Sequence, residues 1–259
     1  MLIEKSRQTI TTMEQWEALA PPKNPAHWVE GRSAMEAARA WLAATPSAPP
    51  EVVNLLATNE NFCNVVLDFA EPEAHLRFDR HRNPRNADLA IWAHDDIGPL
   101  AITVEVKADE EFGDTVSGSI AAALETRIDN PRSGALTRIT DLCLSLFGSR
   151  AKGEATITSL RYQLLTAVAG SLALAATIDA KRAVLIVEEF VTTKTSKANI
   201  ERNANDLNRF LQRLSRSGTD VFNTGKMHGP FVVTGEPLFC GEQELYIGKV
   251  SHFLGEPIA

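Results

Sequence analysis

Apolar and polar residues near the start of the chain follow the spacing of helices. Residues 33–44 open with Ser33 and Glu36 in the order of a capping box and continue with apolar residues on one side. A proline-rich segment at 45–50 ends this helix, because proline cannot continue a helix and restricts the residue before it. The preceding residues 1–30 predict an arm with one short helix.

Between residues 64 and 108 the pattern changes to short β-prone runs and alternating polar and apolar residues, which are typical of strands. A turn is expected at residues 71–73. In the last run, Ile102, Val104 and Val106 share one face. The pattern predicts an antiparallel meander with strands at residues 65–69, 75–79, 88–93 and 101–107.

The second half of the chain predicts long helices separated by short strands. The expected helices cover residues 117–126, 134–147, 156–180 and 199–216. The expected strands cover residues 183–190, 229–234 and 244–250. This order of elements is typical of a mixed α/β (α+β) fold. No linker divides residues 31–259, so we expect a single domain after the N-terminal arm.

The charge balance narrows the choice of partners. The 259 residues include 33 acids and 26 bases, which gives a net charge of −7. A protein that coats nucleic acid without specificity is usually basic. Binding to DNA or RNA would therefore need a local basic patch.

Cysteine usage and hydropathy indicate the cellular compartment of the protein. Cys63, Cys143 and Cys240 are far apart and form no CxxC pair, which fits neither a disulfide framework nor a zinc site. The longest nearly apolar run, 164–178, has fifteen residues, whereas a membrane span needs about 20. We expect a soluble, cytoplasmic protein with no membrane contact.

Familiar cofactor motifs are incomplete or missing in this sequence. Residues 148–153 have the glycine spacing of a P-loop, but Glu154 follows where the motif needs Lys and then Ser or Thr. No nucleotide cofactor is therefore expected.

The most informative pattern is Asp88 followed, after sixteen residues, by Glu105-Val106-Lys107. Side chains alternate along a strand, so Glu105 and Lys107 share one face while Val106 points into the core. A hairpin can bring Asp88 beside Glu105. Two carboxylates and the Val106 carbonyl would give oxygen ligands suited to Mg²⁺ or Mn²⁺. Lys107 would then lie near a metal-bound water or a phosphate.

This pattern resembles the PD-(D/E)xK signature of restriction-endonuclease-like nucleases, with Ala87 where the signature has proline. Residues 105–113 and 160–165 resemble a bacterial branch of that superfamily. The resemblance implies a restriction-endonuclease-like central mixed sheet, with the strand meander, flanked by helices. It also implies a metal site on two strands of a hairpin.

The resemblance suggests further site residues. A helix after the hairpin often supplies a Gln or Tyr near the metal, and Gln163 or Tyr162 could do so here. In other relatives an acid from the first core helix joins the metal, and the candidates are Glu36 and then Glu60. Glu110 could extend the ligand set, or it could lie in a solvated turn.

Two arginine-rich segments could contact phosphates. One lies just before the Asp88 strand and contains Arg77, Arg80, Arg82 and Arg85. The other is spaced along the helix after residue 199, opposite a leucine stripe, and contains Arg202, Arg209, Arg213 and Arg216. Such stripes contact phosphates in nucleic-acid complexes, although most amphipathic helices simply expose their charges to water.

These patterns are compatible with two functions. The first is an Mg²⁺- or Mn²⁺-dependent nuclease that hydrolyses DNA or RNA through Asp88, Glu105, Lys107 and Gln163. The second is an inactive nuclease-like fold that binds nucleic acid or protein, because a Glu-x-Lys strand also carries ordinary cross-strand ion pairs. The sequence leaves open whether the protein forms a homo-oligomer.

Overall fold

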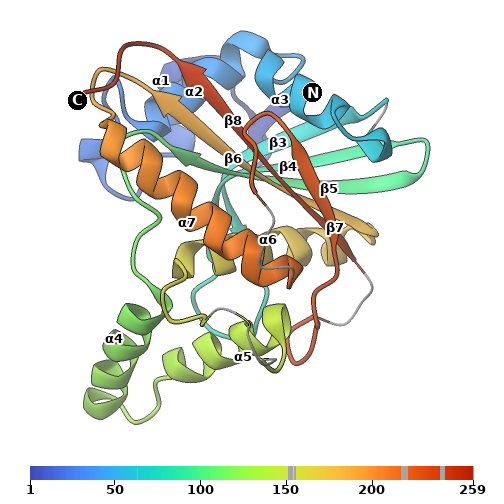
Figure 1. Ribbon diagram of the computed structural model, residues 1–259. Helices are drawn as coiled ribbons and strands as arrows, with labels where there is room; N and C mark the ends of the chain where they lie inside the picture. Colours follow the sequence, from blue (N-terminus) through green and yellow to red (C-terminus); the bar gives the residue numbers. More distant parts are fainter. Residues whose placement is uncertain (63, 151–153, 155, 217–220, 240–242, 259) are drawn as a thin grey trace.

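An eight-stranded mixed sheet forms the centre of the molecule (Figure 1). The computed structural model describes residues 1–62, 64–150, 154, 156–216, 221–239 and 243–258. The strands are β1 (Leu2–Lys5), β2 (Gln8–Thr9), β3 (Val66–Leu76), β4 (Arg85–Asp95), β5 (Gly98–Lys107), β6 (Arg182–Val191), β7 (Met227–Phe231) and β8 (Glu244–Phe253). The α-helices are α1 (Met13–Leu19), α2 (Ser33–Ala44), α3 (Pro50–Ala57), α4 (Val116–Asp129), α5 (Ala135–Phe147), α6 (Tyr162–Thr177) and α7 (Lys197–Ser215), and the 3₁₀ helices are η1 (Pro25–His27) and η2 (Glu60–Phe62). Helices on both faces of a mixed sheet confirm the predicted α/β (mixed α+β) class.

The strand order is β2-β1-β3-β4-β5-β6-β8-β7. Strands β3, β4 and β5 form the predicted antiparallel meander. Strand β6 pairs parallel with β5 and with β8. The chain runs from β5 to β6 through α4, α5 and α6, and from β6 to β8 through α7 and β7. The sheet therefore changes from antiparallel to parallel at β5.

Helices cover both faces of the central strands. Helix α6 packs on one face, and α2 and α3 pack on the other. All ten residues of β6 are buried, as are the last eight of β5. Strands buried on both faces lose the simple alternation of polar and apolar residues, so any charged residue within them lies inside the protein.

Strand β3 corrects one expectation. The sequence predicts two strands with a turn at residues 71–73, but β3 runs unbroken from Val66 to Leu76. Pro72 is accommodated opposite Leu89 of β4, and Glu73 takes a left-handed backbone conformation with φ of +49°. The turn-forming sequence therefore produces a local irregularity in one strand.

Two helix boundaries also differ from those predicted. The proline-rich segment ends α2 but also starts α3, because proline at the first helical position loses no hydrogen bond. Helix α6 begins at Tyr162, six residues later than expected.

The N-terminal segment is part of the main body. Helix α1 is the short helix expected there, and its Trp16 is buried. Strands β1 and β2 were not predicted, and β1 pairs parallel with β3. None of the helices in the described part of the chain combines the length and apolar character needed to cross a membrane.

Candidate active site

Strands β4 and β5 separate at the point where the sequence predicts a site. Their last cross-strand pair joins Leu89 and Val104; beyond it β4 stays with β3, and β5 stays with β6. Asp88 and Glu105 are the first residues past this pair. Asp88 Oδ2 accepts a hydrogen bond from the Val106 backbone N–H at 2.6 Å. The divergence therefore opens the sheet and fixes one carboxylate against the backbone of the next strand.

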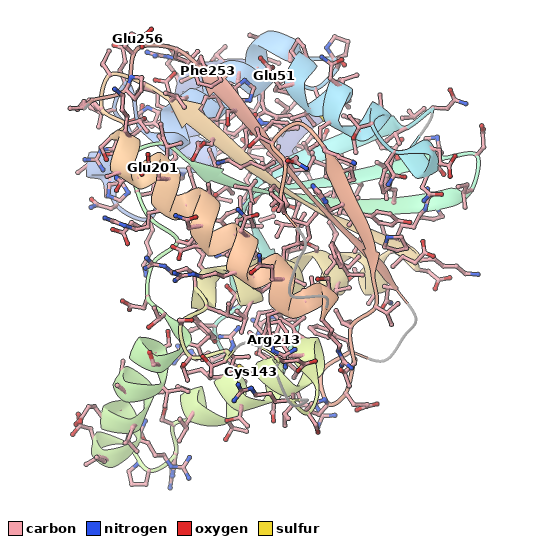
Figure 2. All side chains as sticks on the ribbon, viewed as in Figure 1. Glu51, Cys143, Glu201, Arg213, Phe253 and Glu256 are labelled. Atoms are coloured by element: carbon pink, nitrogen blue, oxygen red, sulfur yellow. The ribbon has the colours of Figure 1, made fainter. Side chains whose placement is uncertain are left out.

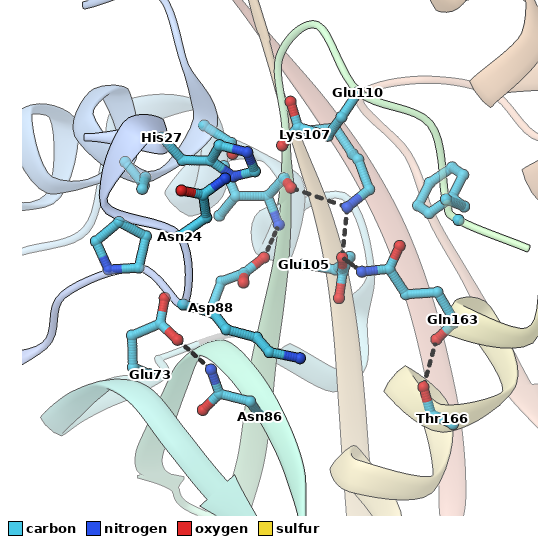
Figure 3. Close-up of a pocket in the computed structure, with 18 of the residues that line it drawn as sticks. Asn24, His27, Glu73, Asn86, Asp88, Glu105, Lys107, Glu110, Gln163 and Thr166 are labelled. Carbon is cyan, nitrogen blue, oxygen red and sulfur yellow. Dashed lines mark hydrogen bonds and ion pairs between the residues drawn. The ribbon is translucent and has the colours of Figure 1, made fainter. Parts of the chain in front are cut away.

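The Glu105 carboxylate is at the centre of the site and is buried. It accepts hydrogen bonds from Lys107 Nζ and from Gln163 Nε2 of α6, each at 2.6 Å (Figure 3). Its second oxygen pairs with the Arg85 guanidinium. Lys107 Nζ also donates to the Val106 carbonyl at 3.2 Å. The structure thus brings together Asp88, Glu105, Lys107 and Gln163, as the sequence predicts.

Burial and neighbouring charges set the protonation states. Burial raises the pKa of Asp88 to about 7, and the nearby Glu105 charge adds to this. Burial alone would raise the pKa of Glu105, but Lys107 and Arg85 outweigh it and lower that pKa. For Lys107, burial is outweighed by Glu105 and Asp88, so its pKa is raised. Glu105 and Lys107 are therefore charged near neutral pH, while Asp88 titrates there.

These residues line a cavity of about 730 Å³. The N-terminal segment forms one wall, with Asn24 and His27 opposite Lys107 (Figure 3). The opposite wall includes Phe112 and residues at the start of α6. Glu105 and Lys107 are only 1% and 3% exposed, so a ligand would reach them through this cavity.

Comparison with known proteins gives a family. A family model described as "Domain of unknown function (DUF6946)" matches residues 9–247. The chain belongs to this family. No curated protein and no solved structure matches it. The DUF6946 match includes both strands of the candidate site as well as the N-terminal residues that line the cavity.

Glu73 is a site residue of this DUF6946 chain that sequence reasoning missed. It lines the cavity and accepts a hydrogen bond from Asn86 Nδ2. Burial raises its pKa. The sequence places Glu73 in a turn, so only the unbroken strand reveals that it lies across from Asp88 on the neighbouring strand.

Glu36 is a predicted metal ligand that the structure places elsewhere. Its carboxylate accepts a hydrogen bond from the Gly31 backbone N–H at 2.7 Å and pairs with Arg39 at 3.1 Å. It is not among the residues that line the cavity. The Glu36 carboxylate therefore binds the backbone at Gly31, before α2, and not at Ser33 as the predicted capping box requires. Because Glu36 does not line the cavity, its predicted role as a metal ligand is wrong. The alternative, Glu60, is exposed in η2 and also lies outside the cavity lining.

Glu110 lines the cavity, in the segment after β5. One of its carboxylate oxygens accepts backbone hydrogen bonds from Ala108 and Asp109, at 3.3 and 3.1 Å. The residue therefore shapes the turn and faces the cavity as well.

The first arginine-rich segment divides into two parts. Arg77, Arg80 and Arg82 are exposed, and Arg77 donates to the carbonyls of His81 and Arg82 within the same loop. Arg85, by contrast, lies inside the site and pairs with Glu105. Three of the four arginines thus remain available at the surface.

The second segment differs from the prediction at Arg213. Arg202 and Arg209 are exposed on α7, and Arg202 pairs with Glu111. Arg213 is buried near Cys143, with its guanidinium 5.0 Å from the ring centre of Phe147 (Figure 2). The four arginines therefore do not form one exposed face, because the helix turns Arg213 toward α5.

Of the cysteines, Cys143 is free and buried, and Cys63 and Cys240 lie outside the described residues, as do residues 151–153 of the P-loop-like segment.

Proposed function

We propose that this protein is a metal-dependent phosphodiesterase of the nuclease type, acting on DNA or RNA. The observation that carries the proposal is the placement of Asp88, Glu105 and Lys107 around one buried point where two strands diverge. This placement is consistent with the resemblance to the PD-(D/E)xK signature. The cytoplasm is the proposed location, in keeping with the sparse cysteines.

The residues present fit a hard divalent cation. Within the described part of the chain, no group of three or more His, Cys, Asp or Glu side chains is arranged to hold a metal. Asp88, Glu105 and the Val106 carbonyl nevertheless supply three oxygen donors, and Mg²⁺ usually keeps several waters beside one or two carboxylates. Burial and the Glu105 charge raise the pKa of Asp88, so additional positive charge beside this carboxylate would favour its ionised form. A divalent cation would supply that charge.

Bound Mg²⁺ or Mn²⁺ would supply a water of lowered pKa and would polarise the phosphate oxygens. Lys107 would hold a positive charge toward the phosphate as negative charge develops on it. Its raised pKa favours this electrostatic role over that of a general base. Gln163 would hold the Glu105 carboxylate in position through its hydrogen bond.

The exposed arginines of the two arginine-rich segments are the proposed contacts to the nucleic-acid backbone. They are Arg77, Arg80 and Arg82 of the loop before β4, and Arg202 and Arg209 of α7. Each would position the strand without reading its sequence.

The test is hydrolysis of single- and double-stranded DNA and RNA in Mg²⁺ or Mn²⁺. Asp88→Asn, Glu105→Gln and Lys107→Ala should each lower the rate by at least about 100-fold, because each removes a charge that the transition state needs. Glu60→Gln, an exposed carboxylate away from the cavity, should retain the wild-type rate. Variants at the three site positions that cleave as fast as wild type would rule out the proposed mechanism.

A second candidate is a nuclease-like fold that only binds its partner. The favouring observation is that both Glu105 oxygens already have partners, namely Lys107, Gln163 and Arg85. Calorimetric titration with Mn²⁺ separates the two candidates. Micromolar binding that is lost in Glu105→Gln favours the enzyme, whereas a protein that binds nucleic acid but no Mn²⁺ favours the binding module.

A further inference from the structure

Helix α4 packs very little against the rest of the molecule. It projects away from the sheet together with the start of α5 (Figure 1). Of its 14 residues, only Val116 and Ala123 are buried. Isolated helices of about 12–15 residues are marginal in water, and most helices in proteins are stabilised by packing of an apolar face. Contact with α5 supplies only part of that packing.

The exposed side of α4 carries its largest apolar residues. Ile120, Leu124 and Ile128 are 37%, 49% and 66% exposed. They recur every four residues, so they form one stripe along the helix. A contiguous exposed apolar stripe on a helix is typical of an interface.

We propose that this stripe pairs with the same stripe of a second copy of the chain. In an antiparallel pair with Leu124 on the two-fold axis, each residue i lies opposite residue 248 − i of the partner. Leu124 then meets its own counterpart, and Ile120 of each copy meets Ile128 of the other. Such a contact is self-complementary, as a closed two-fold interface requires.

The charges around the stripe favour this antiparallel arrangement. Asp114 lies just before α4, and Arg132 lies just after it; both are exposed. In the antiparallel pair the end of each α4, with Arg132 just beyond it, lies beside the start of the partner's α4, which Asp114 precedes, so the opposite charges approach twice across the interface. The helix dipoles are also opposed. A parallel pair would bring like charges together instead.

The pairing would also alter the surroundings of the cavity. Asp114 and Ser119 are among its lining residues. Pairing would therefore bring the Arg132 side chain of each copy toward the acidic rim of the other copy's cavity. The pairing itself does not depend on the proposed nuclease activity.

Sedimentation of the full chain from about 1 to 100 µM tests the proposal. Wild type should form a concentration-dependent dimer, and Leu124→Glu should raise the dimer dissociation constant at least tenfold. Ala122→Glu adds the same charge to an exposed position about 160° around the helix and should leave the dimer unchanged. A wild type that stays monomeric, or a dimer that Leu124→Glu does not weaken, would overturn the proposal.

A charge exchange tests the antiparallel register independently of any loss of folding. Asp114→Arg and Arg132→Asp should each weaken the dimer, and the double variant should restore it. Weakening that adds up in the double variant would contradict the register. Leu124→Cys should form a disulfide-linked dimer on oxidation, whereas Ala122→Cys should not. Equal cross-linking at both positions would contradict the placement of the Leu124 stripe in the interface.

Discussion

The ionised carboxylate of Asp88 lowers the stability of the folded protein, although the proposed function needs it. Its carboxylate accepts a hydrogen bond from the Val106 N–H, but burial and then the neighbouring Glu105 charge raise its pKa. The group is therefore costly to ionise in the folded protein. Strongly perturbed pKa values of this kind cluster at functional sites.

Replacement of this carboxylate should stabilise the protein. The pKa of Asp88 rises from an ordinary 3.8 to about 7, so the folded state holds the proton more tightly than the unfolded state. Stability should therefore fall as pH rises from about 4 to about 7, and the loss is complete above that range. Asp88→Asn should raise the free energy of unfolding by about 1–3 kcal/mol at pH 8 and much less at pH 4. Urea unfolding at the two pH values measures this, and a variant that is destabilised at pH 8 would contradict it.

Gln163 should act by positioning Glu105. Its amide donates to the Glu105 carboxylate from α6, and loss of such an outer contact commonly costs 10–100-fold in metal affinity or activity. Gln163→Ala should therefore weaken Mn²⁺ binding and hydrolysis by about that factor. Thr166→Ala is the matched control, because Thr166 lines the same cavity but bonds only to its own helix backbone. Equal effects of the two substitutions would argue against a positioning role.

At the scale of elements, the sequence predicted the parts whose pattern is local. The meander, α2 and α7 follow directly from alternation, helical spacing and chain breakers. The unbroken β3 could not be predicted, because it depends on continuous pairing with β4 on both sides of Pro72. The same pairing places Glu73 in the site. Because the pairing could not be predicted, the sequence analysis missed this residue. Arg213 was assigned to the wrong face for a similar reason, since its position depends on where α5 packs.

A buried polar chain ties several elements together on the face opposite α6. Glu188 of β6 accepts hydrogen bonds from Trp41 Nε1 of α2 and from His252 Nε2 of β8, each at 2.8 Å. His252 Nδ1 lies 3.3 Å from Glu51 of α3. Burial opposes protonation of His252, but its two carboxylate partners outweigh it and raise its pKa. His252 and Glu188 together thus link two helices to the sheet.

This link should make stability depend on pH. A histidine whose pKa is raised on folding contributes its full stability below its unfolded pKa of about 6.5, and the contribution is lost as pH rises through the higher folded pKa. His252→Gln should therefore cost about 1 kcal/mol or more at pH 6 and distinctly less at pH 9. Thermal unfolding of both proteins across this range measures the difference. A cost that grows with pH would show that the histidine is neutral in the folded protein.

At the scale of the whole molecule, the negative net charge and the proposed polyanionic substrate conflict. Acidic residues line the cavity, whereas the exposed arginines lie in the loop before β4 and along α7, outside the cavity lining. The proposal therefore requires that a divalent cation and local arginines together outweigh the overall charge. The sequence could indicate each group separately, but the folded chain was needed to show which arginines are exposed.

Substrate binding should consequently depend on salt through those arginines. Replacement of Arg77, Arg80 and Arg82 by glutamine should weaken binding of a DNA or RNA oligonucleotide about equally for all sequences, and it should reduce the salt slope by about one per lost phosphate contact. Filter binding at several salt concentrations measures both quantities. A sequence-dependent loss, or an unchanged salt slope, would remove these residues from the interface.

Whether a divalent cation binds at the divergence of β4 and β5 can be read from a crystal soaked in Mn²⁺ and measured for anomalous scattering. We expect a peak between the carboxylates of Asp88 and Glu105, with the Arg85 guanidinium displaced from Glu105. A crystal at millimolar Mn²⁺ that shows no peak there, with Arg85 still paired to Glu105, would contradict the proposed metal site.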